Sequence, residues 1–143
     1  LMEQADWDLK AAAVLRANGF HEWACYACQQ TAEKAIKSAR TLLATHIDTI
    51  KVHSLSNLFG HLPLLSSGGW DPQFLAGLET LTSHSEGARY PGYRGSDPHK
   101  PPHASYEASQ SDEAIASAER TLNYCKKLCA DLATFWSQNS HAP

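Results

Sequence analysis

The feature that most constrains the fold is the stretch from His21 to about Thr45, in which small side chains recur at helical spacing. One face is made almost entirely of them: Ala24, Cys28, Thr31, Ala35, Ala39 and Leu42. Small side chains let another helix approach closely, so this face is expected in the core of a helical bundle. A second face mixes an aromatic ring, an amide and two opposite charges: Tyr26, Gln30, Glu33 and Lys37. The second face is an interface, a binding site or ordinary surface.

Four other segments have helical patterns: about Glu3 to Ala17, Ser54 to Leu62, Asp71 onward, and about Ser109 to Ser137. In the first helix, the expected buried face is Trp7, Ala11, Val14 and Leu15. The four Trp side chains of the whole chain are expected to be packing anchors. Asn18-Gly19 is expected to end this helix, and Ser109 and Ser111 are expected to cap the last one. No strand pattern occurs. The predicted fold is an all-α, up-and-down bundle of four main helices plus a short helix, in a single domain over residues 1–143.

Residues 85–109 differ from the rest of the chain because they are rich in Pro, Gly, Arg, Tyr and His. A stretch of this length without regular structure is unusual in a small domain, so we expect a loop that is mobile or functional. Residues 138–143 are expected to fray.

Composition limits the classes of partner and compartment. The net charge is −3, so no overall positive field attracts nucleic acid and anion binding needs a local cluster. No apolar run is long enough to span a membrane and no signal peptide is present, so a cytoplasmic location is expected. The four cysteines, Cys25, Cys28, Cys125 and Cys129, have the number for a zinc site, but they lie in helical patterns without turn residues. We therefore expect small, reduced core residues and no bound metal.

Three local patterns together resemble the HEPN domain (higher eukaryotes and prokaryotes nucleotide-binding). They are the segment from Glu3 to Phe20, the segment Glu22-Trp-Ala-Cys-Tyr-Ala-Cys-Gln-Gln-Thr-Ala-Glu-Lys-Ala-Ile-Lys37 followed by His53-Ser-Leu, and Ala88-Arg-Tyr-Pro91. The form is similar to the C-terminal module of sacsin, a large chaperone-related protein, and to small prokaryotic members. The resemblance implies a helical homodimer with a groove that binds a nucleotide such as ATP or GTP. The chain is then expected to be a binding module within a larger chaperone-related protein, with no catalytic activity of its own.

Some HEPN proteins are metal-independent ribonucleases that use an Arg-x(4–6)-His motif. Arg94-Gly-Ser-Asp-Pro-His99 fits that count, with His99 as general acid or base and Arg94 as the phosphate ligand. Gly95 and Pro98 place the pair in a loop, and Gly95 stands where the motif usually has a polar residue. A ribonuclease that acts on RNA is therefore kept as the alternative, beside a purely structural dimeriser.

The candidate nucleotide-binding residues are Arg89, Tyr90, Lys37, Lys34, Gln30, Arg94 and His53, and the candidate dimer-interface residues are Trp23, Tyr26 and Glu33. Arg89 either meets a phosphate or pairs with a carboxylate such as Glu33 or Glu86. Lys34 and Lys37 are either a local positive cluster or a solvated helix face. The expected partners are a second copy of the chain and a nucleotide.

Overall fold

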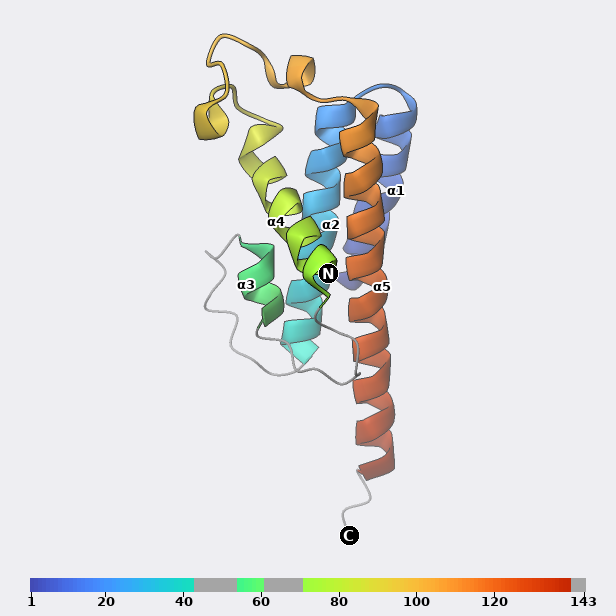
Figure 1. Cartoon of the computed structure of the whole chain (residues 1–143). Coiled ribbons are helices and arrows are strands. Elements are labelled where there is room, and N and C mark those ends of the chain that lie inside the picture. Colours follow the sequence, from blue (N-terminus) through green and yellow to red (C-terminus); the bar gives the residue numbers. More distant parts are fainter. Residues whose placement is uncertain (43–53, 61–70, 140–143) are drawn as a thin grey trace.

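The computed structural model describes residues 1–42, 54–60 and 71–139, and these parts form a bundle of helices (Figure 1). Its four long helices are α1 (Met2–Ala17), α2 (His21–Leu42), α4 (Pro72–Gly87) and α5 (Ala108–Asn139), and α3 (Leu55–Gly60) is short. They alternate in direction, and no strand occurs in the described residues. The predicted all-α, up-and-down bundle of four main helices and a short one is confirmed.

Local chemistry sets the ends of these helices as the sequence predicts. Gly19 follows α1 with a φ of +83°, and the Phe20 N–H donates to the Leu15 carbonyl at 2.9 Å. This left-handed turn reverses the chain directly into α2. At the start of α4, the Asp71 carboxylate accepts a hydrogen bond from the Gln73 N–H at 2.9 Å, and Pro72 is the first helical residue.

The central element is α2, which packs against α1, α4 and α5. Its small-residue face is fully buried from Ala24 to Ala39, as expected, whereas Leu42 at the end of the helix is exposed. A matching close approach joins α4 to α5, where a Cβ added at Gly77 would lie 2.8 Å from the Ser117 Oγ. Small side chains thus bring the helix axes close together.

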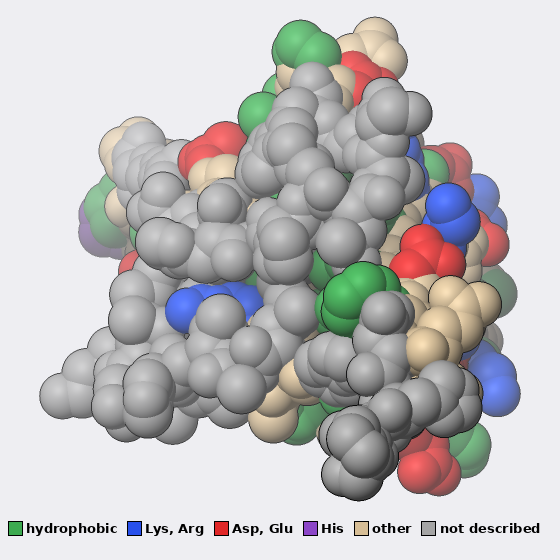
Figure 2. Space-filling view, turned by 90° about the horizontal axis from the view of Figure 1, so that it is seen from below, with side chains coloured by type: hydrophobic (Ala, Val, Ile, Leu, Met, Phe, Trp, Pro, Cys, Tyr) green, Lys and Arg blue, Asp and Glu red, His purple; other side chains and the backbone are tan. Residues whose placement is uncertain are grey.

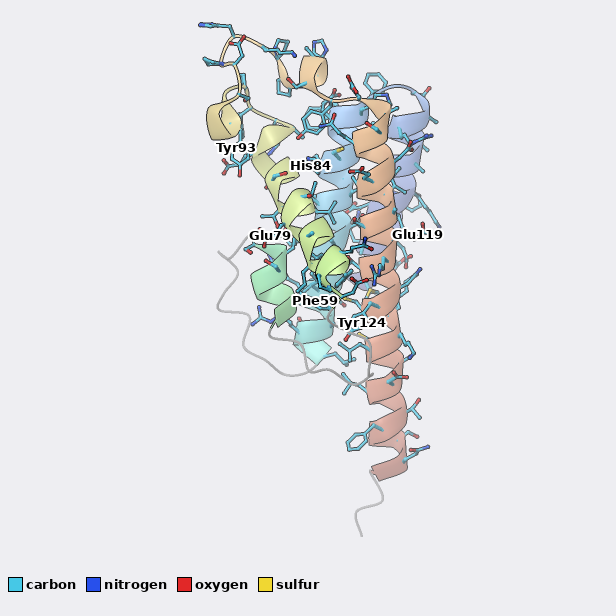
Figure 3. All side chains as sticks on the ribbon, viewed as in Figure 1. Phe59, Glu79, His84, Tyr93, Glu119 and Tyr124 are labelled. Carbon is cyan, nitrogen blue, oxygen red and sulfur yellow. The ribbon has the colours of Figure 1, made fainter. Side chains whose placement is uncertain are left out.

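Large side chains fill the core beside α3. The Phe59 ring lies 4.9 Å from the Phe74 ring and 5.2 Å from the Tyr124 ring, and Figure 3 shows Phe59 and Tyr124 between α3 and α5. The Leu55 N–H donates to the Thr82 hydroxyl at 3.1 Å, which fixes the start of α3 against α4. Burying each of these side chains contributes about 1.5–3 kcal/mol, so this cluster secures α3.

The expected apolar face of α1 is wrong at two of its four positions, while Ala11 and Leu15 are half-buried. Trp7 and Val14 are exposed, at 67% and 62%, and the fully buried residues of α1 are Ala5 and Ala12. Two residues correspond to a rotation of about 200° around a helix, so the face with Trp7 points away from the face with Ala5. The close packing of α1 against α2 selects the alanine face because it has no bulk.

The segment between α4 and α5 is shorter and more regular than expected. It contains two short 3-10 helices, η1 (Tyr93–Gly95) and η2 (Pro102–Ser105), and it lies at the same end of the bundle as the turn between α1 and α2 (Figure 1). The first residue of α5 is Ala108, so Ser109 lies inside the helix. Ser111 is buried and bonds to the Ala108 carbonyl, so it is no cap either.

At the opposite end, Figure 2 shows acidic and basic side chains alternating along one edge of the described surface. No patch of a single sign gathers among the described side chains in that view. Within the described residues, no helix combines the length and apolar character needed to cross a membrane.

Candidate functional site

A hollow of about 480 Å³ opens at the end of the bundle where the turn between α1 and α2 meets the end of α4 and η2. Its size falls in the range of small-molecule sites, about 300–1,000 Å³. Its walls combine apolar, aromatic and charged groups: Gly19, Phe20, Glu22, Trp23, Ala88, Arg89, Pro102 and His103. Phe20 and Trp23 are about half exposed, at 52% and 46%, so their rings face solvent beside the opening.

Arg89 is the central cation of this site. Its guanidinium carbon lies 5.0 Å from the Tyr26 ring centre and 5.2 Å from the Tyr90 ring centre, and its Nε donates to the Ser85 carbonyl at 2.6 Å. The Trp23 ring meets the Tyr26 ring edge to face at 6.1 Å. We call Trp23, Tyr26, Arg89 and Tyr90 the Arg89 cluster.

The geometry holds the Arg89 side chain in place without neutralising it. Cation–π contacts and one backbone hydrogen bond position the guanidinium. Arg89 pairs with neither Glu33 nor Glu86, and it forms no ion pair with any described residue. The guanidinium is exposed and has spare N–H donors, so it is available to an anionic ligand.

Glu22 lines the same hollow from the first turn of α2 and is only 6% exposed. Its negative charge contributes to raising the pKa of the Cys25 thiol and of the Tyr106 hydroxyl, after the larger effect of burial in both cases. The hollow therefore places a buried carboxylate and an exposed guanidinium on one small surface.

Tyr90 borders a second hollow of about 410 Å³, and Pro102 lines both hollows. There the His84 Nδ1 and the Tyr106 hydroxyl form a hydrogen bond of 2.9 Å. Burial lowers the pKa of His84 from 6.5 to about 4, so the imidazole is neutral at pH 7. Figure 3 shows His84 on α4 near the segment that carries Tyr93. This pair fastens η2 to α4 and thereby shapes the wall of the first hollow.

Three predicted site residues lie further along α2, away from the Arg89 cluster. Lys34 pairs with Asp8 of α1 at 2.5 Å, and Lys37 pairs with Glu33 at 3.1 Å. The Gln30 amide donates to the Gln29 side chain at 2.7 Å. On the mixed face of α2, Tyr26 therefore contacts Arg89, whereas Gln30, Glu33 and Lys37 bind groups within the bundle.

The predicted Arg94 and His99 lie in the segment after α4. Gly95 has a φ of +84°, which explains why a glycine follows Arg94, since other residues rarely adopt this conformation. His99 is exposed, and its backbone N–H donates to the Asp97 carboxylate at 2.8 Å. His99 does not line the first hollow, and the side chain of Arg94 lies outside the described part of the structure. His53, also predicted to bind, lies outside the described residues.

The cysteines lie in the core. Burial raises the pKa of Cys25 and Cys125 to about 12 and raises that of Cys28 as well, so these thiols stay protonated. All four are free thiols, and in the described part of the chain no three His, Cys, Asp or Glu side chains gather in a way that could hold a metal ion.

Sequence reasoning overlooked three residues of the hollow: Phe20, Glu22 and His103. The helical spacing could have identified Glu22, because it precedes Tyr26 by four residues and so lies on the same face of α2. Phe20 and His103 come from a turn and from η2, where no periodicity indicates which way a side chain points.

Comparisons with known proteins agree with this fold. The model of the HEPN domain family matches residues 1–128. The crystal structure of TT1696 from Thermus thermophilus is similar with a TM-score of 0.77 and 25% identity, over 89% of this chain and 94% of that one. The crystal structure of ST0689, an archaeal HEPN homologue, has a TM-score of 0.68 and 28% identity, over 90% of this chain and 93% of that one. A comparison with curated proteins gave no match. The chain therefore belongs to the HEPN domain family.

Proposed function

We propose that the chain is a homodimeric module that binds a nucleotide in the hollow beside Arg89. The observation that carries this proposal is the guanidinium of Arg89, which aromatic rings position and which no described carboxylate neutralises. A guanidinium presents paired N–H donors that match the oxygens of a phosphate. The same hollow offers the exposed rings of Phe20 and Trp23, on which a planar base can stack.

Lys34 and Lys37 have a supporting role in this proposal. Both ammonium groups are bound to carboxylates, of Asp8 and Glu33, so a phosphate would have to compete with an existing ion pair. Arg89 has no such competitor among the described residues. The phosphate therefore binds first at Arg89, and the proposed binding contains no catalytic step.

The dimeric part of the proposal is supported by exposed aromatic surface around the hollow. Phe20, Trp23 and Tyr90 are each about half exposed, at 52%, 46% and 56%. Aromatic residues of this kind are enriched in protein interfaces. The resemblance to the C-terminal module of sacsin supports the further proposal that the module works within a larger chaperone-related protein.

The test is calorimetric titration of the protein with GTP and ATP. Binding is expected in the wild type, and Arg89→Ala is expected to weaken it about tenfold or more because a charge-assisted phosphate contact is lost. Arg89→Lys keeps the charge but loses the paired donors, so its affinity is expected to lie between the two.

Lys127→Ala is the matched control. Lys127 is an exposed cation of α5 with no ion pair among the described residues, so its loss changes the net charge by the same amount. It lies about 28 Å along α5 from the first residue of that helix. Unchanged affinity is expected. If Arg89→Ala and Lys127→Ala weaken binding equally, only the net charge matters and the proposed site is wrong.

A further inference from the structure

The side chain of Glu22 is largely buried, yet its carboxylate has no hydrogen-bond or ion-pair partner among the described residues. Glu22 is 6% exposed and lines the hollow. Its oxygens are not among the buried atoms without a partner, so they are open to the hollow. The first turn of α2 favours a negative charge there, because a helix dipole stabilises an anion at its N-terminus. The oxygens of Glu22 are thus free to accept hydrogen bonds from a molecule in the hollow.

The chemistry of a carboxylate restricts what that molecule can be. An ionised carboxylate has two acceptor oxygens and no donor. The Watson–Crick edge of guanine carries two adjacent donors, the N1–H and the N2 amino group, which match the two oxygens in parallel. The same edge of adenine has one donor beside the acceptor N1, which a carboxylate repels.

We infer that the hollow is selective for guanine nucleotides and that Glu22 accepts hydrogen bonds from N1–H and N2–H of the base. This inference rests on the nucleotide binding proposed above. The rings of Phe20 and Trp23 line the same hollow and provide faces for the base. Arg89 forms another part of the wall and meets the phosphates. The base and the phosphates of a guanine nucleotide then each have a complementary group.

The experiment compares GTP, ITP and ATP by calorimetry on the wild type. GTP is expected to bind about tenfold or more tightly than ATP, which is the usual discrimination of a paired contact to a base edge. ITP lacks the N2 amino group but keeps N1–H, so its affinity is expected to lie between the two.

The variant Glu22→Gln keeps the size of the side chain and replaces one acceptor oxygen by a donor group. Its affinity for GTP is expected to fall to about that for ATP, while the affinity for ATP does not fall. Its melting temperature, measured by circular dichroism, is expected to be no lower than that of the wild type, because the Glu22 carboxylate makes no hydrogen bond or ion pair with a described residue that the change would break. Equal loss of all three nucleotides with a lower melting temperature would show that Glu22 is structural and would overturn the inference.

The outcomes separate the two proposals. If GTP and ATP bind with equal affinity to the wild type, the guanine selectivity is wrong and the nucleotide site stands. If none of the three nucleotides binds at millimolar concentration, the proposed nucleotide binding is wrong and the selectivity falls with it.

Discussion

At the scale of the residue, burial controls the chemistry of the groups that hold the hollow together. The His84 imidazole is 4% exposed, and its Nδ1 is bonded to the Tyr106 hydroxyl. Its Nε2 has no hydrogen-bond partner among the described residues. No charged neighbour compensates for a proton on the ring, so desolvation lowers its pKa from 6.5 to about 4.

The low pKa of His84 predicts how stability depends on pH. Between about pH 6.5 and pH 4 the unfolded chain binds the proton and the folded chain does not, so the free energy of unfolding falls as the pH is lowered through this window. At pH 4.5 the loss relative to pH 7 amounts to about 2–3 kcal/mol. In His84→Gln that part of the pH dependence is expected to vanish. Urea unfolding at pH 7 and pH 4.5 measures it.

The two carboxyl groups whose pKa is lowered act below this window. The pKa of the exposed Asp71 and Asp112 carboxyls is lowered below 3.8, chiefly by hydrogen bonds from Arg120 and Arg16, so any effect of these groups belongs to lower pH. If wild type and His84→Gln lose the same stability between pH 7 and pH 4.5, then another group is responsible and the assignment to His84 is wrong.

Individual side chains were the hardest part of the site to predict from sequence. Arg89 and Tyr26 were both expected in the site, but their contact depends on where α4 ends relative to α2. The bond from His84 to Tyr106 joins two segments across η1, and no spacing rule relates them. Trp7 was misassigned because an aromatic side chain is usually buried, whereas close packing of α1 against α2 selected the alanine face.

At the scale of the element, the turn between α1 and α2 determines where the hollow begins. Gly19 has a φ of +83°, and an added Cβ would meet no atom within 4 Å. The need for glycine is therefore a matter of backbone conformation alone, without crowding. The turn brings Phe20 and Glu22 to the wall of the hollow. Its conformation therefore determines the shape of the hollow as well as the end of α1.

Gly19 gives a graded prediction. An L side chain in the left-handed conformation costs about 1–2 kcal/mol, and Asn tolerates it better than Ala. The order of stability in urea unfolding is therefore expected to be wild type, then Gly19→Asn, then Gly19→Ala. An Ala variant as stable as the wild type would contradict a left-handed residue at this turn.

Helix positions were well predicted because the signals that set them are local. Asn18-Gly19 and Asp71-Pro72 act within one helical turn, and the small-residue face of α2 repeats over its whole length. The start of α5 was misplaced by one residue, since the Gln110 side chain accepts from the Glu107 N–H at 2.7 Å and starts the helix earlier. The serines expected to cap it lie inside the first turn.

At the scale of the whole molecule, the hollow and the exposed rings of Phe20, Trp23 and Tyr90 lie at one end of the bundle. This end joins the α1–α2 turn, the end of α4 and η2, while α5 continues far beyond the other helices at the opposite end (Figure 1). A second copy that covers Phe20, Trp23 and Tyr90 would also enclose the hollow. Dimerisation and nucleotide binding would then be linked, so each would strengthen the other.

Two exposed tryptophans provide a test of this dimer. Trp23 borders the hollow, whereas Trp7 lies on α1 and is the more exposed of the two, at 67%. Sedimentation at micromolar concentration is expected to show a dimer for the wild type and for Trp7→Asp, and a monomer for Trp23→Asp. An aspartate in the first turn of α2 is compatible with the helix, because the helix dipole favours it there, and circular dichroism checks the fold.

A monomer with Trp7→Asp and a dimer with Trp23→Asp would place the interface on α1, and a monomeric wild type would exclude the dimer. If the linkage holds, GTP raises the dimer fraction of the wild type at a concentration where both species are populated.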